Sequence, residues 1–242
     1  MRDRGGEVAT AFGTSPGGTR WQTIEPERRT RVPVGLDGRQ RTGRAPAAPP
    51  IGARMRDTVP MERPDDRDFG PGLAAVRAAP TDGGRLELIV RRPAVDRRDV
   101  LDEAQLDAAE GVLGDNWRHR GSRSMPDGSA NPACQVTVIS TRVLAAIEPD
   151  RERWPLAGDQ LYVDLDLSLE GLPPGSRLAI GDAVIEVSGR PHTGCAKFGA
   201  RFGSDALRWI STPVGRELRM RGLNARVVEP GTIRAGDEVR RA

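Results

Sequence analysis

Residues 157–188 read AGDQLYVDLDLSLEGLPPGSRLAIGDAVIEVS, and their pattern is that of a β-rich domain. The runs QLYVDL at 160–165 and AVIEVS at 183–188 are rich in β-branched and hydrophobic residues, as strands are. The Gly181-Asp182 pair separates the second run from a short strand at 178–180, and such a pair is a typical connection in a β-hairpin. The stretch therefore predicts three strands joined by short turns.

Further strands are predicted on both sides of this stretch, at 85–91, 135–140, 224–229 and 238–240, with turns at 230–231 and 236–237. Short helices are predicted at 141–147, 205–210 and 214–220. The acidic segment 99–111 predicts either a short helix or a turn-rich connection. Many short strands with glycine-containing turns favour a closed barrel or a sandwich, so we expect a mainly β domain over residues 84–241.

The first 70 residues have a different composition. They are rich in Arg, Pro and Gly, and their 13 arginines exceed their 10 carboxylates, which accounts for the whole formal net charge of +3. Such a segment buries too little apolar surface to offset the entropy of ordering it. We expect residues 1–70 to be a disordered extension. It is either a basic tail that binds an anionic surface or, as we favour, a stretch that precedes the true start at Met55 or Met61.

Composition argues against several classes of protein. Residues 71–242 carry equal numbers of positive and negative side chains without interleaved aromatic and basic residues, so nucleic acid is not expected as a partner. The sequence has no run of about 18 apolar residues to span a membrane and no secretory signal layout. Its two cysteines are too few for a disulfide framework. These features together predict a cytoplasmic protein.

The segment 188–203, SGRPHTGCAKFGARFG, concentrates the chemically reactive side chains. Cys195 lies close in sequence to His192, Lys197 and Arg201, and Lys197 is the only lysine of the chain. Neighbouring cations favour the thiolate, which is the reactive form of cysteine. Cys195 and His192 are therefore candidate catalytic residues.

Three other interpretations of Cys195 stay open. It can be a buried, inert thiol, as free cysteines often are. It can form part of a zinc site with His192, Cys134 and His119, although the spacing matches no standard zinc pattern. A disulfide between Cys134 and Cys195 is disfavoured by the expected compartment, and we interpret Cys134 as structural.

A second segment, GVLGDNWRHRGSR at 111–123, places Arg118, Arg120 and Arg123 after a Gly-Asp turn. Arginines in a turn-rich loop can bind a phosphate through forked hydrogen bonds. Such a run can equally be a solvated surface, and the sequence leaves both interpretations open.

Four motifs in order resemble the MOSC domain, the C-terminal module of molybdenum-cofactor sulfurases, which also occurs as stand-alone bacterial proteins. They are GVLGDNW at 111–117, the quoted stretch at 157–188, RPHTGCAKF at 190–198 and RGLNARVVEPGTIRAGDEV at 221–239. Two departures are visible. Pro191 is separated from Cys195 by three residues, where many members have proline directly before cysteine, and Gly158-Asp159-Gln160 replaces the usual glycine-glutamate-asparagine.

The resemblance implies a MOSC-type β-barrel with Cys195 at the position of the family's reactive cysteine, as a ligand to molybdenum or as a sulfur carrier. The cofactor is then molybdenum cofactor (molybdopterin), an anionic pterin. The cations expected around it are Lys197, Arg201, Arg118, Arg120 and Arg123. The resemblance also implies pyridoxal-phosphate binding, but only because the family is associated with that cofactor.

For function, the resemblance implies reduction of N-hydroxylated small molecules. The sequence has no nicotinamide, flavin or iron–sulfur motif, so the electrons must come from a separate donor protein. The alternatives are a sulfur carrier that takes a Cys195 persulfide from a cysteine desulfurase, and a non-catalytic cofactor-binding module.

Overall fold

The computed structural model describes residues 71–242 and, before them, only strand β1 (Arg20–Gln22). Apart from β1, which pairs antiparallel with strand β3 (Arg98–Leu101), the predicted extension over residues 1–70 lies outside the described residues. The mainly β fold expected for the rest of the chain is confirmed.

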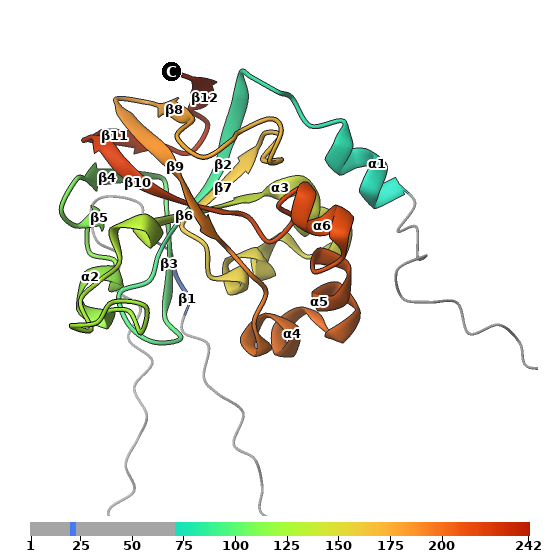
Figure 1. Cartoon of the computed structure of the whole chain (residues 1–242), viewed down its shortest axis with the longest axis horizontal. Helices are drawn as coiled ribbons and strands as arrows, with labels where there is room; N and C mark the ends of the chain where they lie inside the picture. The colour runs from blue at the N-terminus through green and yellow to red at the C-terminus, as the bar shows by residue number, and fades with distance from the viewer. Residues whose placement is uncertain (1–19, 23–70) are drawn as a thin grey trace, which may run out of the picture. The chain divides into compact units, whose positions relative to one another are not determined.

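Among the described residues, seven strands close into a β-barrel (Figure 1). Each strand is hydrogen-bonded to the next, and the last pairs with the first. Their order is β2 (Gly84–Arg91), β12 (Glu238–Arg241), β8 (Arg177–Ile180), β9 (Ala183–Pro191), β10 (Leu223–Glu229), β6 (Val136–Ser140) and β7 (Leu161–Asp164). All neighbours are antiparallel except β6 and β7, which are parallel.

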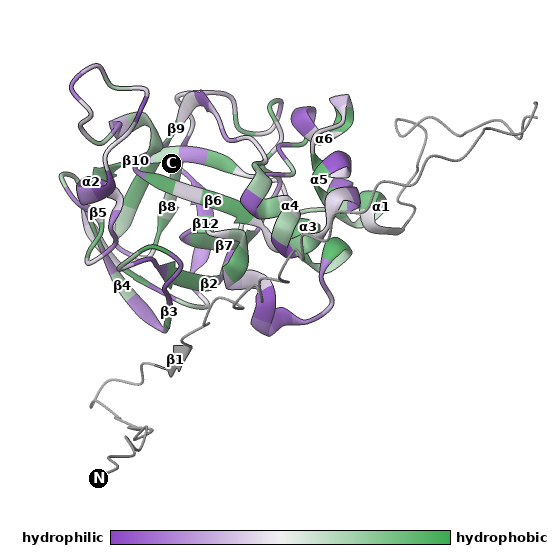
Figure 2. Ribbon diagram, turned by 90° about the horizontal axis from the view of Figure 1, so that it is seen from below, coloured by the Kyte–Doolittle hydropathy of each residue, from purple (hydrophilic) through white to green (hydrophobic). Residues whose placement is uncertain are grey.

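The hairpin of β8 and β9 forms where the sequence predicts it. Ile180 pairs with Ala183 across the turn, and Gly181 adopts φ +54°, a conformation that favours glycine. Along β9, Ala183, Ile185 and Val187 are buried in alternation with more exposed residues. This period of two sends one face of the strand into the barrel interior, and Figure 2 shows hydrophobic residues along the barrel strands.

The segment 99–111 consists mainly of strands, so the prediction of a short helix or a turn-rich connection is wrong. It contains β3, β4 (Glu103–Asp107) and the start of β5 (Gly111–Val112), and β4 pairs with β11 (Gly231–Arg234) in a second sheet ordered β11-β4-β5. Burial alternates along β4, and Ala104 and Leu106 join the barrel core. Packing of these two side chains outweighs the low strand preference of the surrounding acidic residues. The turn predicted at 230–231 leads directly into β11, which was not predicted.

Helices cover one side of the barrel, and the small sheet with α2 (Trp117–Arg120) lies at the other (Figure 1). The covering elements are α1 (Pro71–Arg77), α3 (Thr141–Ile147), α4 (Ala196–Phe202), α5 (Ser204–Ile210), α6 (Pro213–Glu217) and the 3-10 helix η3 (Arg151–Ala157). The predicted helices at 141–147, 205–210 and 214–220 are confirmed, although α6 ends earlier than predicted. Tyr162, Phe198 and Trp209 belong to a second hydrophobic cluster, which packs these helices against the barrel.

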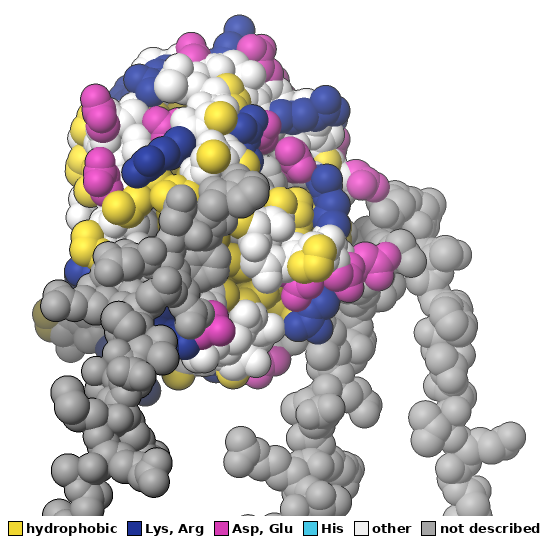
Figure 3. Space-filling view, turned by 90° about the vertical axis from the view of Figure 1, so that its right-hand side faces the viewer, with side chains coloured by type: hydrophobic (Ala, Val, Ile, Leu, Met, Phe, Trp, Pro, Cys, Tyr) yellow, Lys and Arg dark blue, Asp and Glu magenta, His cyan; other side chains and the backbone are white. Residues whose placement is uncertain are grey.

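In the described part of the chain, every helix is too short or too polar to cross a membrane. On the face shown in Figure 3, Lys and Arg side chains are interspersed with Asp and Glu.

Candidate functional site

A cavity of about 390 Å³ lies between the β2–β3 loop, the end of β9 and α4. We call it the Cys195 pocket. In the described part of the chain, it is lined by six cations and one carboxylate, together with two cysteines and a histidine. They are Arg92, Arg98, Arg120, Lys197, Arg201 and Arg221, then Asp96, then Cys134, Cys195 and His192. Such an excess of positive charge raises the local concentration of anions.

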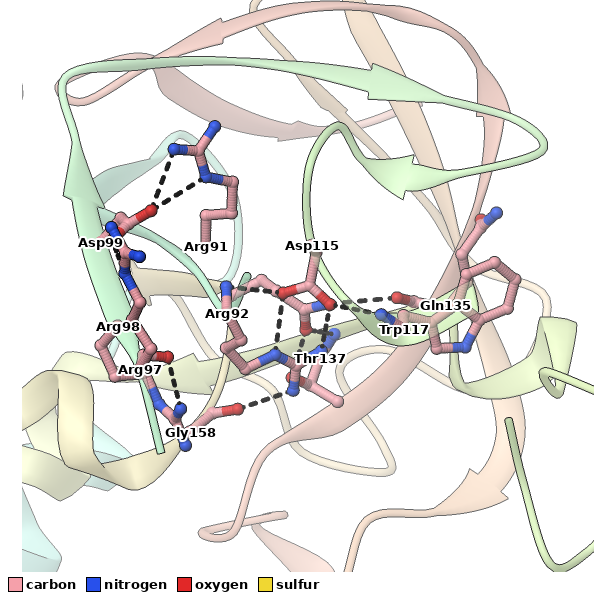
Figure 4. A network of polar contacts seen from close by, with 11 residues as sticks. Arg91, Arg92, Arg97, Arg98, Asp99, Asp115, Trp117, Gln135, Thr137 and Gly158 are labelled. Atoms are coloured by element: carbon pink, nitrogen blue, oxygen red, sulfur yellow. Dashed lines mark hydrogen bonds and ion pairs between the residues drawn. The ribbon is translucent and has the colours of Figure 1, made fainter. Parts of the chain in front are cut away.

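Arg92 is fixed in the wall of the pocket by Asp115, which lies in the Gly-Asp turn of the 111–123 segment. Its guanidinium donates two hydrogen bonds to the Asp115 carboxylate, at 2.9 and 3.0 Å, and a third to the Gly158 carbonyl at 2.8 Å (Figure 4). Asp115 also accepts hydrogen bonds from the main-chain N–H groups of Arg92 and Trp117. The buried carboxylate is thus fully engaged, and Arg92 is held in one position.

Arg221 is held in a similar way by Asp159. Its Nη1 lies 2.7 Å from Asp159 Oδ2, and its Nη2 donates to the Ala157 carbonyl at 3.0 Å. Its guanidinium lies over the ring of Phe198, 5.0 Å from the centroid. The short 157–159 segment therefore anchors both Arg92 and Arg221.

His192 lies against this anchor. Its Nδ1 is 3.4 Å from Asp159 Oδ1, and 17% of its side chain remains exposed. Burial and, after it, the positive charge of Arg221 lower the pKa of His192 to about 4, against the opposing effect of Asp159. The imidazole is consequently neutral near pH 7, and its contact with Asp159 is not an ion pair.

Cys195 immediately precedes α4 and is exposed, so the interpretation as a buried, inert thiol is wrong. Lys197 and Arg201, which follow on α4, both face Asp96 in the β2–β3 loop. Arg201 Nη2 lies 2.8 Å from Asp96 Oδ1, and Lys197 Nζ lies 3.6 Å from it. Asp96 is thus the counterion of these two cations at the pocket.

Several polar atoms of the pocket have no hydrogen-bond partner among the residues that the structure describes. They are Nε of Arg98, Oδ1 of Asn116, Nδ1 of His192 and Nε of Arg221, all buried. Burial lowers the pKa of Arg98 and of Arg120, and neighbouring arginines lower both further. Buried groups without partners cost free energy. An anion bound here would accept hydrogen bonds from the two guanidinium nitrogens and reduce the repulsion, whereas the Asn116 amide oxygen needs a donor.

The structure brings together five of the seven residues singled out from sequence. Cys195, His192, Lys197, Arg201 and Arg120 line the pocket, whereas Arg118 and Arg123 are not in its lining. Arg118 instead forms an ion pair with Glu110 on the surface.

Cys134 lies in the pocket lining and is half buried, a placement that its sequence context did not suggest. Burial raises the pKa of its thiol, and Arg190 and Arg120 counteract this in part. Both cysteines are free. Within the described ranges, no three His, Cys, Asp or Glu side chains are grouped so as to hold a metal ion, so the geometry does not support the zinc interpretation.

Sequence reasoning missed Arg92, Arg98 and Arg221. Each comes from an element distant from Cys195 in the sequence. The Gly-Asp turns at 114–115 and 158–159 were the available signal, since each of their carboxylates fixes one of these arginines.

The family model for the MOSC domain matches residues 125–240. This chain contains a MOSC domain. The structure is similar to the crystal structure of the YuaD protein from Bacillus subtilis, with 18% sequence identity and a TM-score of 0.51. The similarity covers 64% of this chain and 93% of the YuaD chain. The crystal structure of YiiM from Escherichia coli is also similar, with 20% sequence identity and a TM-score of 0.43; the similarity covers 65% of this chain and 69% of the YiiM chain. No curated protein matches the sequence.

The matched MOSC segment does not contain the whole pocket. Arg92, Asp96, Arg98 and Arg120 precede residue 125, as does barrel strand β2. Cys195, His192 and Arg221 lie within the match. The MOSC segment therefore supplies the thiol, and the preceding segment supplies half of the cations.

Proposed function

We propose that this MOSC protein binds molybdenum cofactor with Cys195 as a ligand to the metal, and that it reduces N-hydroxylated small molecules. The observation that carries the proposal is an exposed thiol in a pocket that, in the described part of the chain, is lined by six cations and one carboxylate. A thiolate is a soft ligand suited to molybdenum, and guanidinium groups suit the phosphate of the pterin.

The residues present fit this cofactor. The buried nitrogens without partners on Arg98 and Arg221 are donors, which an anionic ligand can satisfy. A cofactor that brings its own ligands to the metal needs few from the protein, so the single exposed thiol suffices. When bound, it would supply a redox-active metal.

The protein's own residues have separable roles in this proposal. Arg98 and Arg120, whose side chains form no ion pair with any described carboxylate, bind the phosphate. Lys197 and Arg201 complete the positive wall when the ligand displaces Asp96 from them. His192 is neutral near pH 7, so it can donate one hydrogen bond to substrate or accept one from it. Electrons come from a separate donor protein, because the sequence has no nicotinamide or flavin motif and its two cysteines fall short of the four thiolates of an ordinary iron–sulfur cluster.

The exposure of Cys195 also favours a second candidate function, sulfur transfer. A sulfur carrier must offer its cysteine to another protein, here a cysteine desulfurase, and an exposed thiol beside cations can do so. In that case Cys195 holds a persulfide, and the pocket binds a sulfur-accepting anion.

The test is elemental analysis for molybdenum and zinc on protein from a cofactor-competent host. We expect near-stoichiometric molybdenum in the wild type and in Cys134→Ser, and its loss in Cys195→Ser. The Cys134→Ser control matters because both thiols line the pocket. Reduction of a hydroxylamine by the loaded protein with an added reductant then separates an enzyme from a binding module.

Other outcomes would overturn the proposal in distinct ways. A persulfide on Cys195 without molybdenum, detected by mass spectrometry, would support sulfur transfer. Molybdenum that survives in Cys195→Ser would remove Cys195 as the ligand, and molybdenum absent from every variant would remove the cofactor.

A further inference from the structure

A second cavity, of about 220 Å³, lies on the other side of the wall formed by Pro191, His192 and Thr193. It is bounded by the end of β9, the corner between α5 and α6, and the loop between β7 and β8. We call it the β9 pocket. His192 and Arg221 line both cavities, so an occupant of the β9 pocket lies next to the Cys195 pocket.

The walls of the β9 pocket are largely apolar. Leu169, Pro174, Ile210 and Leu223 contribute to them, and Leu169 is one of few large hydrophobic side chains that are exposed, at 48%. Its volume is below the 300–1,000 Å³ that is about typical of sites for drug-sized ligands. The pocket therefore suits a small molecule with one apolar ring rather than an extended ligand.

The charge of the β9 pocket has one sign. Arg190, Arg216 and Arg219 line it together with Arg221, and no carboxylate of the described residues does. Within residues 71–242, Arg216 and Arg219 donate hydrogen bonds only to main-chain carbonyls. Burial lowers the pKa of Arg219, and no acidic neighbour offsets this. Arg221 is paired with Asp159, but Arg190, Arg216 and Arg219 form no ion pair with a described carboxylate, and an anionic group on the ligand is the complement that they lack.

Gly189 lies in an irregular part of β9, where the pairing with β10 shifts register between Val187 and Pro191. A glycine inside a strand often marks such a bulge, or a place where a ligand or another backbone approaches closely. Gly189 has no positive φ, and a Cβ placed on it would meet only Pro174, at 3.8 and 3.9 Å, which is ordinary contact. The space beside Gly189 is therefore open to a larger side chain, and because the residue lines the β9 pocket, a substitution there probes the pocket directly.

From these observations we propose that the β9 pocket is a binding site for a small aromatic carboxylate, distinct from the cation-lined site around Cys195. The ring lies against Leu169, Pro174 and Ile210, and the carboxylate faces the arginines. This site requires no metal, so its existence is separable from cofactor binding.

Benzoate and its uncharged counterpart benzamide are the probes, titrated into the full-length protein by calorimetry and NMR. We expect saturable benzoate binding in the millimolar range or tighter, and benzamide binding weaker by roughly tenfold because a charge-assisted hydrogen bond is lost. Gly189→Leu, which fills the pocket, should weaken benzoate by roughly tenfold or more. Arg216→Gln should weaken it severalfold.

Matched controls locate the site. Ala200→Leu adds the same side chain to an exposed position of α4, and Arg208→Gln removes an arginine that lines neither pocket; both should bind benzoate as the wild type does. Lys197→Gln reports on the Cys195 pocket. Weakening by Lys197→Gln but not by Gly189→Leu would place the anion in the Cys195 pocket and overturn the proposal. Equal affinity for benzoate and benzamide, or no saturable binding of either, would also overturn it.

Discussion

Around the Cys195 pocket, Asp115 and Asp159 each hold one arginine through a carboxylate, while a main-chain carbonyl of residue 157 or 158 takes another nitrogen of the same guanidinium. Removing one partner of such a buried pair costs about 3 to 5 kcal/mol, because it leaves an uncompensated buried charge. These pairs therefore hold Arg92 and Arg221 in place beside a bound ligand. Because each guanidinium charge is already paired with a carboxylate, neither arginine fully neutralises the ligand's negative charge.

Unlike the buried Asp115 and Asp159, Asp96 is an exposed carboxylate whose ion pairs a ligand can replace. Of the described residues, it is the one carboxylate in the lining of the Cys195 pocket. It is more than half exposed, and its φ of +60° is unusual for a residue other than glycine. Asp and Asn tolerate this conformation better than most residues. Since its ion pairs with Arg201 and Lys197 are partly solvated, an incoming anion can displace them at small cost.

The buried, neutral His192 predicts a particular dependence of stability on pH. In the unfolded chain the imidazole binds a proton below about pH 6.5, whereas in the folded protein it does so only below about pH 4. Its contribution is therefore complete above about pH 6.5 and is lost as the pH falls toward 4, by about 3 kcal/mol in all. Urea unfolding of the wild type and of His192→Gln at about pH 7 and about pH 4 measures it.

The His192→Gln variant is itself the control in this experiment, because it has the same carboxylates as the wild type and lacks only the imidazole. We expect the wild type to lose about 3 kcal/mol more than His192→Gln between the two pH values. Equal losses would show that His192 does not carry a depressed pKa.

At the scale of elements, the sequence predicted the strands whose hydrophobic pattern is local and complete. The hairpin of β8 and β9 shows its period and its turn within residues 177–191, and the structure has both. The β4 segment has only Ala104 and Leu106 to mark its buried face, among acidic neighbours that are poor strand formers. Its strand forms because β11, more than a hundred residues later, pairs with it.

The candidate site likewise combines residues that are close in sequence with residues that only the fold brings together. Cys195, Lys197 and Arg201 were found together because they follow one another in sequence, at the start of a helix that was not itself predicted. Arg92 and Arg221 were not found, because barrel closure brings β2 and the start of β10 to the same place. No local pattern in the sequence contains that information.

The strand assignment of β4 can be tested by its alternation. Leu106 is fully buried in the barrel core, and its neighbour Gln105 is exposed. Leu106→Ala should lower the free energy of unfolding by about 2 to 5 kcal/mol, because it removes buried apolar surface and leaves a cavity. Gln105→Ala should change it by no more than about 0.5 kcal/mol. Denaturant titration of both variants measures the difference, and similar values would contradict the assigned faces.

At the scale of the whole molecule, the barrel depends on strand β12, which pairs with β2 on one side and β8 on the other. Removing residues 238–242 would expose two sheet edges and delete Val239, which is fully buried. We expect this truncated protein to aggregate or to lose cooperative unfolding, as followed by size-exclusion chromatography and thermal circular dichroism. Removing Ala242 alone is the matched control and should leave the melting transition close to that of the wild type.

The place of β12 also has a consequence for how a cell must make this protein. β2 leaves the ribosome about 150 residues before the strand that covers one of its edges, a delay of roughly 10 to 30 s at the usual rate of translation. The β8–β9 hairpin needs only microseconds once it has emerged. Throughout that delay Gly84 and Arg85 lack their β12 partner, whereas residues 89–91 can already pair with β3. This uncovered start of β2 is the place where the nascent chain can pair with another copy before its barrel closes.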